Sequence, residues 1–151
     1  MSDLLDFPPH KHNLRLLSIH SIYLNRIRDG SKTIELRTYN TGLLPGSWCL
    51  AYETKPVQQI STVFRCSGFW CLSPQDAWQK HHSILGIDQD PYFEYFANRQ
   101  CAYGYIIDKV LNFEPLTFDQ LKQDLKFTPP QGSPRWNHSR IYGRILDAIK
   151  Q

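Results

Sequence analysis

The sequence predicts an α+β domain built on a small mixed barrel or curled sheet of about five or six strands with short flanking helices. Three observations lead to this prediction. The chain has 151 residues, which is enough for one domain with its own hydrophobic core. Its hydrophobic fraction of 41%, with 13% aromatic residues, is typical of a globular protein. Strand patterns follow one another without the regular β-α alternation of a doubly wound sheet.

The first strand and helix are expected after a short lead-in. Residues 1–13 contain two adjacent prolines and a His-Lys-His run, and we expect a flexible tail before a single domain at residues 14–151. An apolar strand is predicted at residues 14–17. Ser18 is placed to cap a helix, and Gly30 is placed to end it in the left-handed conformation. The apolar residues of this helix recur at three- and four-residue steps: Ile19, Ile22, Tyr23 and Ile27.

The stretch from Asp29 to Arg37 is expected to be a helix end, a glycine stop and a short strand. Period-two alternation sends the apolar side chains to one face of this strand and the polar ones to the other. The apolar pair is Ile34 and Leu36, and the polar set, with a lysine at the strand's start, is Lys32, Thr33, Glu35 and Arg37. The polar face predicts one wall of a polar cleft. The alternative is a solvated strand face with a Glu35–Arg37 pair.

The middle of the chain is predicted to hold strands and one helical excursion. After a turn at residues 44–46, strands are expected at residues 48–52 and 57–72, with a bulge or sharp bend at Gly68. Ser73 followed by proline starts a helix, and Asp88 opens a second one. The second helix supplies aromatic residues that we expect in the core: Tyr92, Phe93, Tyr95 and Phe96.

The last third of the chain is expected to return to the sheet and close with helices. A strand is predicted at residues 101–113, and residues 117–120 have the spacing of a capping box for a helix ending near Leu125. Three prolines exclude regular structure from residues 128–134. The final segment has apolar residues at helical spacing and is predicted to be an amphipathic closing helix.

Composition and motifs exclude several classes of function. No apolar run approaches the length of a membrane span and no signal-peptide pattern is present, so we expect a cytoplasmic protein. The four cysteines form no C-x-x-C pair and are expected to be buried free thiols: Cys49, Cys66, Cys71 and Cys101. His81 and His82 are helix neighbours pointing to different sides, so no metal site is predicted. No cofactor is predicted either, since nucleotide-loop, hydrolase and metalloprotease motifs are lacking.

The helix is followed by the motif Gly30-x-Lys32-x-x-Glu35-x-Arg37. This motif and the order of elements around it resemble the ASCH domain family, whose signature is G-x-K-x-x-E-x-R. ASCH domains belong to the PUA-like group of small β-barrels. The resemblance spans residues 14–113. Supporting features are the turn at Pro45-Gly46, the strand ending at Tyr52, the nearby Pro56 and the aromatic strand at residues 103–107. The loop at Pro129-Pro130-Gln131 is similar to one in some longer members.

The resemblance implies a partner that is a nucleic acid, most often RNA, or a modified nucleoside or nucleotide. Lys32 and Arg37 are then expected to contact phosphate, and Glu35 to accept a hydrogen bond from an exocyclic amine of a base. Tyr52 or Trp136 would stack on an exposed base, which suits single-stranded RNA. The alternative places Tyr52 in the barrel core and Trp136 against the proline-rich loop. The predicted binding surface is completed by Lys55, Pro56, Gln131 and Arg135.

Two other functions remain open from the sequence. Some small ASCH proteins are amidohydrolases that act on N4-acetylcytidine with a lysine, a threonine and a glutamate. The lysine corresponds to Lys32, but the threonine's place is Glu35, with Thr33 one residue after the lysine, and the glutamate's place falls near Leu85. The resemblance also implies a possible ribonuclease, because related domains have been proposed to have this activity; Glu35 would then be the general base, with Lys32 and Arg37 as the phosphate clamp. The third hypothesis is a protein-interaction module that uses the loop at Arg135-Trp136.

Overall fold

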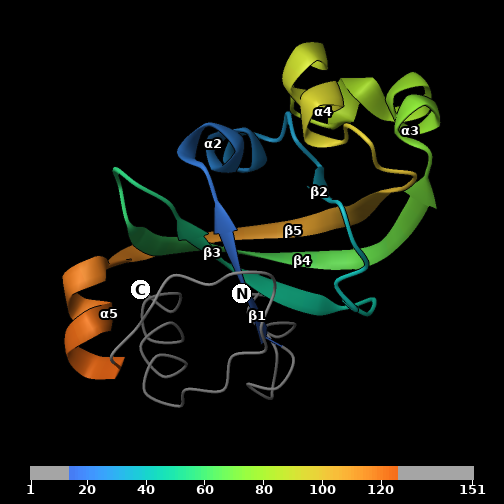
Figure 1. Ribbon diagram of the computed structural model, residues 1–151. Helices are drawn as coiled ribbons and strands as arrows, with labels where there is room; N and C mark the ends of the chain where they lie inside the picture. The colour runs from blue at the N-terminus through green and yellow to red at the C-terminus, as the bar shows by residue number, and fades with distance from the viewer. Residues whose placement is uncertain (1–13, 126–151) are drawn as a thin grey trace.

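In the computed structural model, which describes residues 14–125, five strands form one sheet in the order β1-β3-β4-β5-β2 (Figure 1). The strands are β1 (Leu14–Ile19), β2 (Ile34–Arg37), β3 (Ser47–Glu53), β4 (Gln59–Leu72) and β5 (Ala102–Thr117). The helices are α2 (Ser21–Asp29), α3 (Pro74–His81), α4 (Gln89–Tyr95) and α5 (Phe118–Leu125), with a 3-10 turn, η2, at His82–Ile84. The predicted α+β class with a small, mixed, curled sheet is confirmed.

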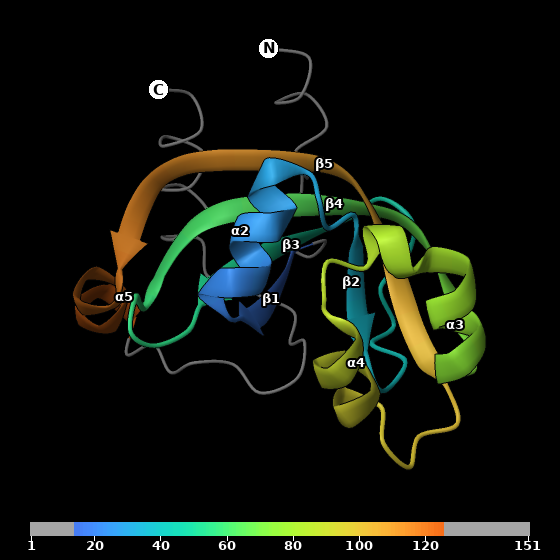
Figure 2. The same ribbon diagram turned by 90° about the horizontal axis from the view of Figure 1, so that it is seen from above.

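The sheet is a half-barrel that stays open between its two edge strands. β1 pairs in parallel with β3, and the other neighbouring strands pair antiparallel. Within residues 14–125, β1 and β2 pair with no strand on their outer edges. Figures 1 and 2 show α2 and the α3–α4 pair on the same side of the sheet, near β2. The open seam between β1 and β2 therefore has helices on its flanks.

The long hairpin of β4 and β5 bends the sheet. Their register shifts between Arg65 and Cys66 and again between Cys66 and Gly68, so the predicted irregularity at Gly68 is confirmed. Beyond this bulge, the second half of β4 pairs with the part of β5 that also pairs with β2. The bend thus brings β2 and the excursion between β4 and β5 round toward β1.

The start of α2 differs from the prediction. Ser18 belongs to β1, and His20 occupies the helix N-cap position without a side-chain hydrogen bond. The strand is longer than predicted because its ladder with β3 continues to the pair Ile19–Glu53. Ile22, predicted to face the core, is exposed, and Leu24 and Ile27 are the buried residues. Gly30 ends the helix with φ +86°, as predicted.

A buried polar network fixes α2 against the sheet. Arg28 Nη2 donates to Glu53 Oε1 at 3.0 Å and to Ser61 Oγ at 2.8 Å, and Arg28 Nε donates to Thr62 Oγ1 at 2.9 Å. Glu53, Ser61 and Thr62 are all buried, so the guanidinium supplies hydrogen bonds to polar groups that are shielded from water. The helix that follows β1 is therefore held in one place relative to β3 and β4.

The helical excursion from residue 73 to residue 101 packs on the apolar face of β2. Ser73 caps α3 by accepting from the Asp76 N–H at 3.1 Å, as predicted. Side chains from the excursion form one buried cluster with β2: Ile34, Leu36, Ala77, Leu85, Tyr92, Phe96 and Ala102. Tyr95 was predicted to join them, but it is 44% exposed because it lies on a different face of α4.

The other local predictions have mixed outcomes. The capping box of α5 is confirmed by two reciprocal bonds, Thr117 N–H to Gln120 Oε1 at 2.9 Å and Gln120 N–H to Thr117 Oγ1 at 3.3 Å. All four cysteines are free thiols, but only Cys49 and Cys66 are buried; Cys71 is exposed at the end of β4, so the prediction for it was wrong.

Several predictions fall on residues outside the described range. These are the flexible lead-in at residues 1–13, the proline-rich loop at residues 128–134 and the closing helix. None of the helices in the described part of the chain has the length and apolar character of a membrane-spanning segment.

Candidate functional site

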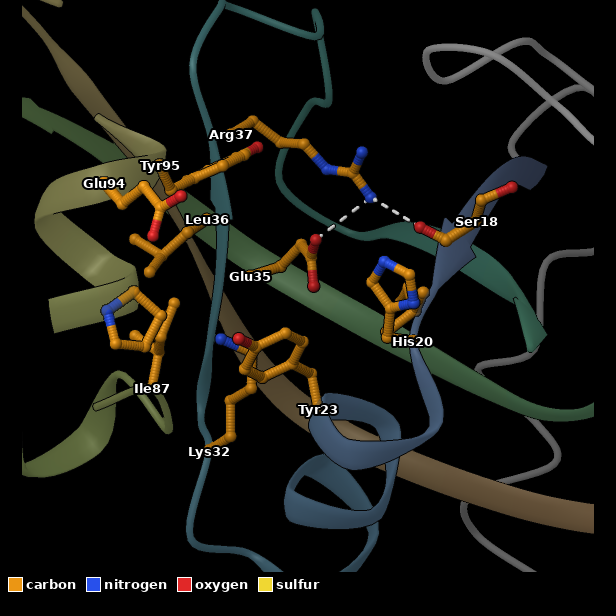
Figure 3. A pocket seen from close by; sticks show the side chains of 12 residues that line it. Ser18, His20, Tyr23, Lys32, Glu35, Leu36, Arg37, Ile87, Glu94 and Tyr95 are labelled. Carbon is orange, nitrogen blue, oxygen red and sulfur yellow. Dashed lines mark hydrogen bonds and ion pairs between the residues drawn. The ribbon is translucent and has the colours of Figure 1, made fainter. Parts of the chain in front are cut away.

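A pocket of about 670 Å³ lies in the seam between the open edges of β1 and β2 (Figure 3). The end of β1 and the start of α2 form one side, the polar face of β2 forms the floor, and α4 with the preceding turn forms the other side. Its lining residues are Ser18, Ile19, His20, Tyr23, Lys32, Glu35, Leu36, Arg37, Ile87, Pro91, Glu94 and Tyr95. The pocket thus joins segments that are far apart in the sequence.

The alternation of β2 determines which of its side chains reach the pocket. Ile34 and Leu36 are buried and contribute to the cluster with α3 and α4, and Leu36 also reaches the edge of the pocket. Glu35 and Arg37, on the opposite face, line the pocket together with Lys32. These three polar residues of the sequence signature therefore line one cavity; the face is not solvated, although the Glu35–Arg37 pair of the alternative is present.

Glu35 and Arg37 form a largely buried ion pair. Arg37 Nη2 lies 3.0 Å from Glu35 Oε1, and the two side chains are 14% and 7% exposed. The same nitrogen donates to the carbonyl oxygen of Ser18 at 3.5 Å, so the pair bridges the seam between β2 and β1 (Figure 3). Arg37 Nε is buried and has no hydrogen-bond partner in the described structure. The ion pair thus leaves one donor of the guanidinium unsatisfied next to the pocket.

Lys32 is buried to an extent that is unusual for lysine, with 5% of its surface exposed. Its Nζ donates to the carbonyl oxygen of Leu85 at 2.6 Å and lies 5.7 Å from the centre of the Tyr23 ring. Burial lowers the pKa of Lys32 from 10.5 to about 8, because it disfavours the charged form, while the charge of Glu35 acts in the opposite direction. Near neutral pH this amine can therefore donate or accept a proton.

The strap, which we define as residues 84–87, holds Lys32 in place. The Thr33 N–H donates to the Ile84 carbonyl at 3.0 Å, and Arg26 Nη1 donates to the Gly86 carbonyl at 2.9 Å. Gly86 has φ +63°, and a Cβ added there would lie 2.2 Å from Lys32 Cβ. Only glycine lets the strap cross this close to the lysine. The lysine's position therefore depends on the excursion as well as on β2.

Nine of the twelve lining residues were not among the predicted site residues, and four of the nine carry polar or aromatic side chains of interest for binding: His20, Tyr23, Glu94 and Tyr95. His20 Nδ1 lies 3.0 Å from Thr54 Oγ1. Glu94 and Tyr95 lie on the pocket side of α4, and burial raises the pKa of the Tyr95 hydroxyl. One sequence signal could have suggested this face, because Pro91, Glu94 and Tyr95 are spaced at three and four residues on a short helix.

Other predicted site residues lie away from the pocket. Tyr52 is 1% exposed in a core cluster with Trp48 and Leu50, which matches the alternative that placed it in the core, so base stacking on it is excluded. Lys55 and Pro56 are exposed in the turn between β3 and β4. Thr33 does not line the pocket, and the side chain of Leu85, near the expected glutamate position, is buried. Gln131, Arg135 and Trp136 lie outside the described residues, and so does the predicted interaction loop.

The buried amine predicts a specific pH dependence of stability. The unfolded lysine titrates near 10.5 and the folded one near 8, so between these values the unfolded chain binds more protons. The unfavourable effect of burying the charge is present in full below about pH 8 and is relieved as the pH rises toward 10.5. Relative to Lys32→Met, wild type should therefore gain roughly 3 kcal/mol in free energy of unfolding across this window. Urea unfolding of both proteins at several pH values measures the gain, and parallel curves would contradict it.

Metal binding has no support in the described region. Within residues 14–125, no three side chains of His, Cys, Asp or Glu lie close enough to hold a metal ion together. His81 and His82 instead contact aromatic rings, with His81 stacked on Trp70 and His82 near Trp78.

Solved structures similar to this fold include an ASCH protein. The ASCH protein from Zymomonas mobilis superposes with a TM-score of 0.83 at 19% identity, covering 93% of this chain and 98% of its own. A mutant of the same protein gives a TM-score of 0.81 at 19% identity, with 91% and 97% covered. The N-terminal domain of Staphylothermus marinus McrB is more distant, at 0.54 and 10% identity over 91% and 93%. No family model matches the sequence, and no curated protein matches it.

Proposed function

We propose that this chain, which has the fold of the ASCH protein from Zymomonas mobilis, binds one base of single-stranded RNA or of a nucleotide in the pocket between β1 and β2. The observation that supports this most is the convergence of Lys32, Glu35 and Arg37 on one cavity of about 670 Å³. A carboxylate, an amine and a guanidinium together offer the acceptors and donors that the edge of a base requires. The cytoplasmic location predicted from the sequence is part of this proposal.

Charge favours the base rather than the phosphate as the buried part of the ligand. Two carboxylates, Glu35 and Glu94, line the pocket, while Arg37 is already paired and Lys32 has a lowered pKa. A phosphate inside would lose its hydration and face both carboxylates. We therefore place the base in the pocket and the phosphate at its mouth, which differs from the sequence-based expectation that Lys32 and Arg37 contact phosphate.

Aromatic side chains at the pocket support recognition of a planar ligand. Tyr23 lies on the α2 side, and Tyr95 lies on the α4 side with 44% of its surface exposed (Figure 3). Stacking on such rings contributes about 1–3 kcal/mol per base in proteins that bind single strands. These tyrosines take the role that the sequence had suggested for Tyr52.

Affinity measurements on three variants test the proposal. Calorimetry against the four ribonucleosides, their 5′-monophosphates and a short single-stranded RNA should show preference for one base. Lys32→Met and Glu35→Gln should each weaken binding at least tenfold, about 1.4 kcal/mol, because each removes a contact to the base edge. Lys55→Ala is the control, since this exposed lysine lies outside the pocket lining, and it should bind like wild type. Equal affinity in all four proteins would contradict the proposal.

A hydrolytic function of the same pocket is the second candidate, and Glu94 favours it. The resemblance had required a glutamate from the helical excursion, and Glu94 on α4 supplies a carboxylate to the pocket that also holds Lys32. With a pKa of about 8, Lys32 is suited to accept a proton from an attacking water. Turnover of N4-acetylcytidine or RNA that is lost in Lys32→Met and Glu94→Gln would establish this activity. If no turnover is seen at high protein concentration, the hydrolytic function is wrong and only the binding function remains.

A further inference from the structure

We propose that Cys71 and Cys101 form an oxidation site, in which a peroxide converts the two thiols into a disulfide that closes the neck of the helical excursion. The neck is the point where the chain leaves the sheet at the end of β4 and returns to it at the start of β5 (Figure 1). This inference does not depend on what the pocket binds.

The strand register places the two thiols on one face of the hairpin. Leu72 pairs with Ala102, and Cys71 pairs with Tyr103. Cys101 is the residue directly before β5 and precedes Tyr103 by two positions, so continuing the strand's alternation by one residue puts its side chain on the face of Cys71, as a diagonal neighbour. Hydrogen bonding with Cys71 raises the pKa of the Cys101 thiol and of the Tyr103 hydroxyl, as expected for groups in contact. Diagonal neighbours start further apart than the Cα atoms of a disulfide, so the bond requires Cys101, which lies just before the first residue of β5, to move toward Cys71 while the β4–β5 ladder stays paired.

Neighbouring contacts hold the neck in register. The Trp70 ring lies directly over Gly104, where an added Cβ would be 2.3 Å from the ring. The same ring stacks on His81 of α3, with centroids 4.8 Å apart. The end of β4, the start of β5 and α3 are therefore fixed relative to one another before any bond forms.

The reaction balances with a peroxide as oxidant. The exposed Cys71 thiolate attacks one peroxide oxygen, so an S–O bond forms, the O–O bond breaks and hydroxide or alkoxide leaves. Cys101 then attacks the sulfenic sulfur, so the S–S bond forms and the S–O bond breaks with release of water. Both sulfurs are oxidised and the peroxide is reduced. Because the pKa of Cys101 is raised, this second step should become faster with increasing pH.

The disulfide would restrain one wall of the pocket. The closed loop contains the strap, which binds Lys32 through the Leu85 carbonyl, and α4, which carries Glu94 and Tyr95. Cross-linking the two ends of a loop removes conformational freedom from states in which that loop is open. Oxidation at the neck should therefore make openings of the pocket wall rarer.

Mass spectrometry of the peroxide-treated full chain under non-reducing conditions tests this. We expect a peptide pair joined through Cys71 and Cys101, a rise in Tm of about 5 °C and slower hydrogen exchange across residues 74–95. Reduction with dithiothreitol should reverse all three changes. Cys71→Ser and Cys101→Ser should each lose the cross-link while keeping the Tm of the reduced wild type, since Cys71 is exposed and Cys101 is only partly buried.

The buried pair Cys49 and Cys66 serves as an internal control, because the peroxide should leave both unmodified. Overoxidation of Cys71 without a cross-link would overturn the proposal. So would a cross-link between Cys71 residues of two copies of the chain, or a Cys71–Cys101 bond that leaves exchange at residues 74–95 unchanged.

Discussion

Replacing Gly86 with alanine is expected to lower the free energy of unfolding by about 3 kcal/mol and to weaken ligand binding at least tenfold. Gly86 has φ +63°, a conformation that costs an L-residue roughly 1–2 kcal/mol. The new Cβ would also lie 2.2 Å from Lys32 Cβ, and such overpacking costs roughly 1–3 kcal/mol more. Relief requires the strap or Lys32 to move, which would break the bond from Nζ to the Leu85 carbonyl. Urea unfolding and calorimetry measure the two effects.

Gly46 offers a matched control for this substitution. Its φ of +88° is also positive, but a Cβ added there meets no atom within 4 Å. Gly46→Ala should therefore show only the conformational cost, about 1 kcal/mol, with unchanged ligand affinity. If both variants lose the same stability, the contact between Gly86 and Lys32 does not have the importance that we assign to it.

Removing one partner of the buried Glu35–Arg37 ion pair is the second substitution expected to lower the free energy of unfolding strongly. Glu35→Ala leaves the guanidinium of Arg37, only 14% exposed, without its carboxylate. Breaking a buried pair in this way typically costs 3–5 kcal/mol, and partial exposure of Arg37 suggests a loss of about 3 kcal/mol. The double variant Glu35→Leu with Arg37→Met should recover much of this stability because no charge remains unpaired. It should not recover ligand binding, since both polar groups are gone.

The pair between Arg65 and Asp108 serves as a comparison at the surface. Arg65 Nε donates to Asp108 Oδ1 at 3.0 Å, and the two side chains are 23% and 29% exposed. Asp108→Ala should cost less than about 1 kcal/mol, as is usual for solvent-exposed pairs. Equal losses from Glu35→Ala and Asp108→Ala would contradict the view that burial makes the first pair sensitive.

Local patterns predicted those parts of the fold that depend on neighbouring residues. The stop at Gly30, the alternation of β2, the cap at Ser73 and the capping box at Thr117 all use hydrogen bonds or side-chain directions within a few positions. For the same reason the face of β2 that carries Glu35 was predicted correctly. The alternation of side chains along β2 can be read from consecutive residues, without information about the rest of the chain.

Features that depend on distant segments were not predictable in the same way. The start of α2 was misplaced because β1 is extended by its ladder with β3, 34 positions further on at the pair Ile19–Glu53. Tyr52 is buried because β3 lies between β1 and β4 and its side chains supply core clusters on both faces of the sheet. Local sequence alone left the core position of Tyr52 as one of two alternatives and did not indicate the longer strand.

The wall of the pocket formed by α4 was also not predictable from the local sequence, because it depends on distant segments. Glu94 and Tyr95 reach the pocket only because the bend of the sheet brings α4 beside β2, and the sequence suggested Tyr95 for the core. The lowered pKa of Lys32 results from its burial, and the strap that crosses the lysine at Gly86 is distant from it in the sequence. The sequence thus identified the polar floor of the site, and the tertiary structure supplies its two sides.

The most direct measurement of the central claim is NMR mapping of base binding on the ¹⁵N-labelled chain. On addition of the preferred ribonucleoside, amide shifts should concentrate at His20, at residues 32–37 and at residues 87–95, which surround the pocket. The exposed turn around Lys55 should remain unchanged, and Glu35→Gln should abolish the shifts. Saturable shifts centred on any other surface, or none with any base, would contradict binding in the seam between β1 and β2.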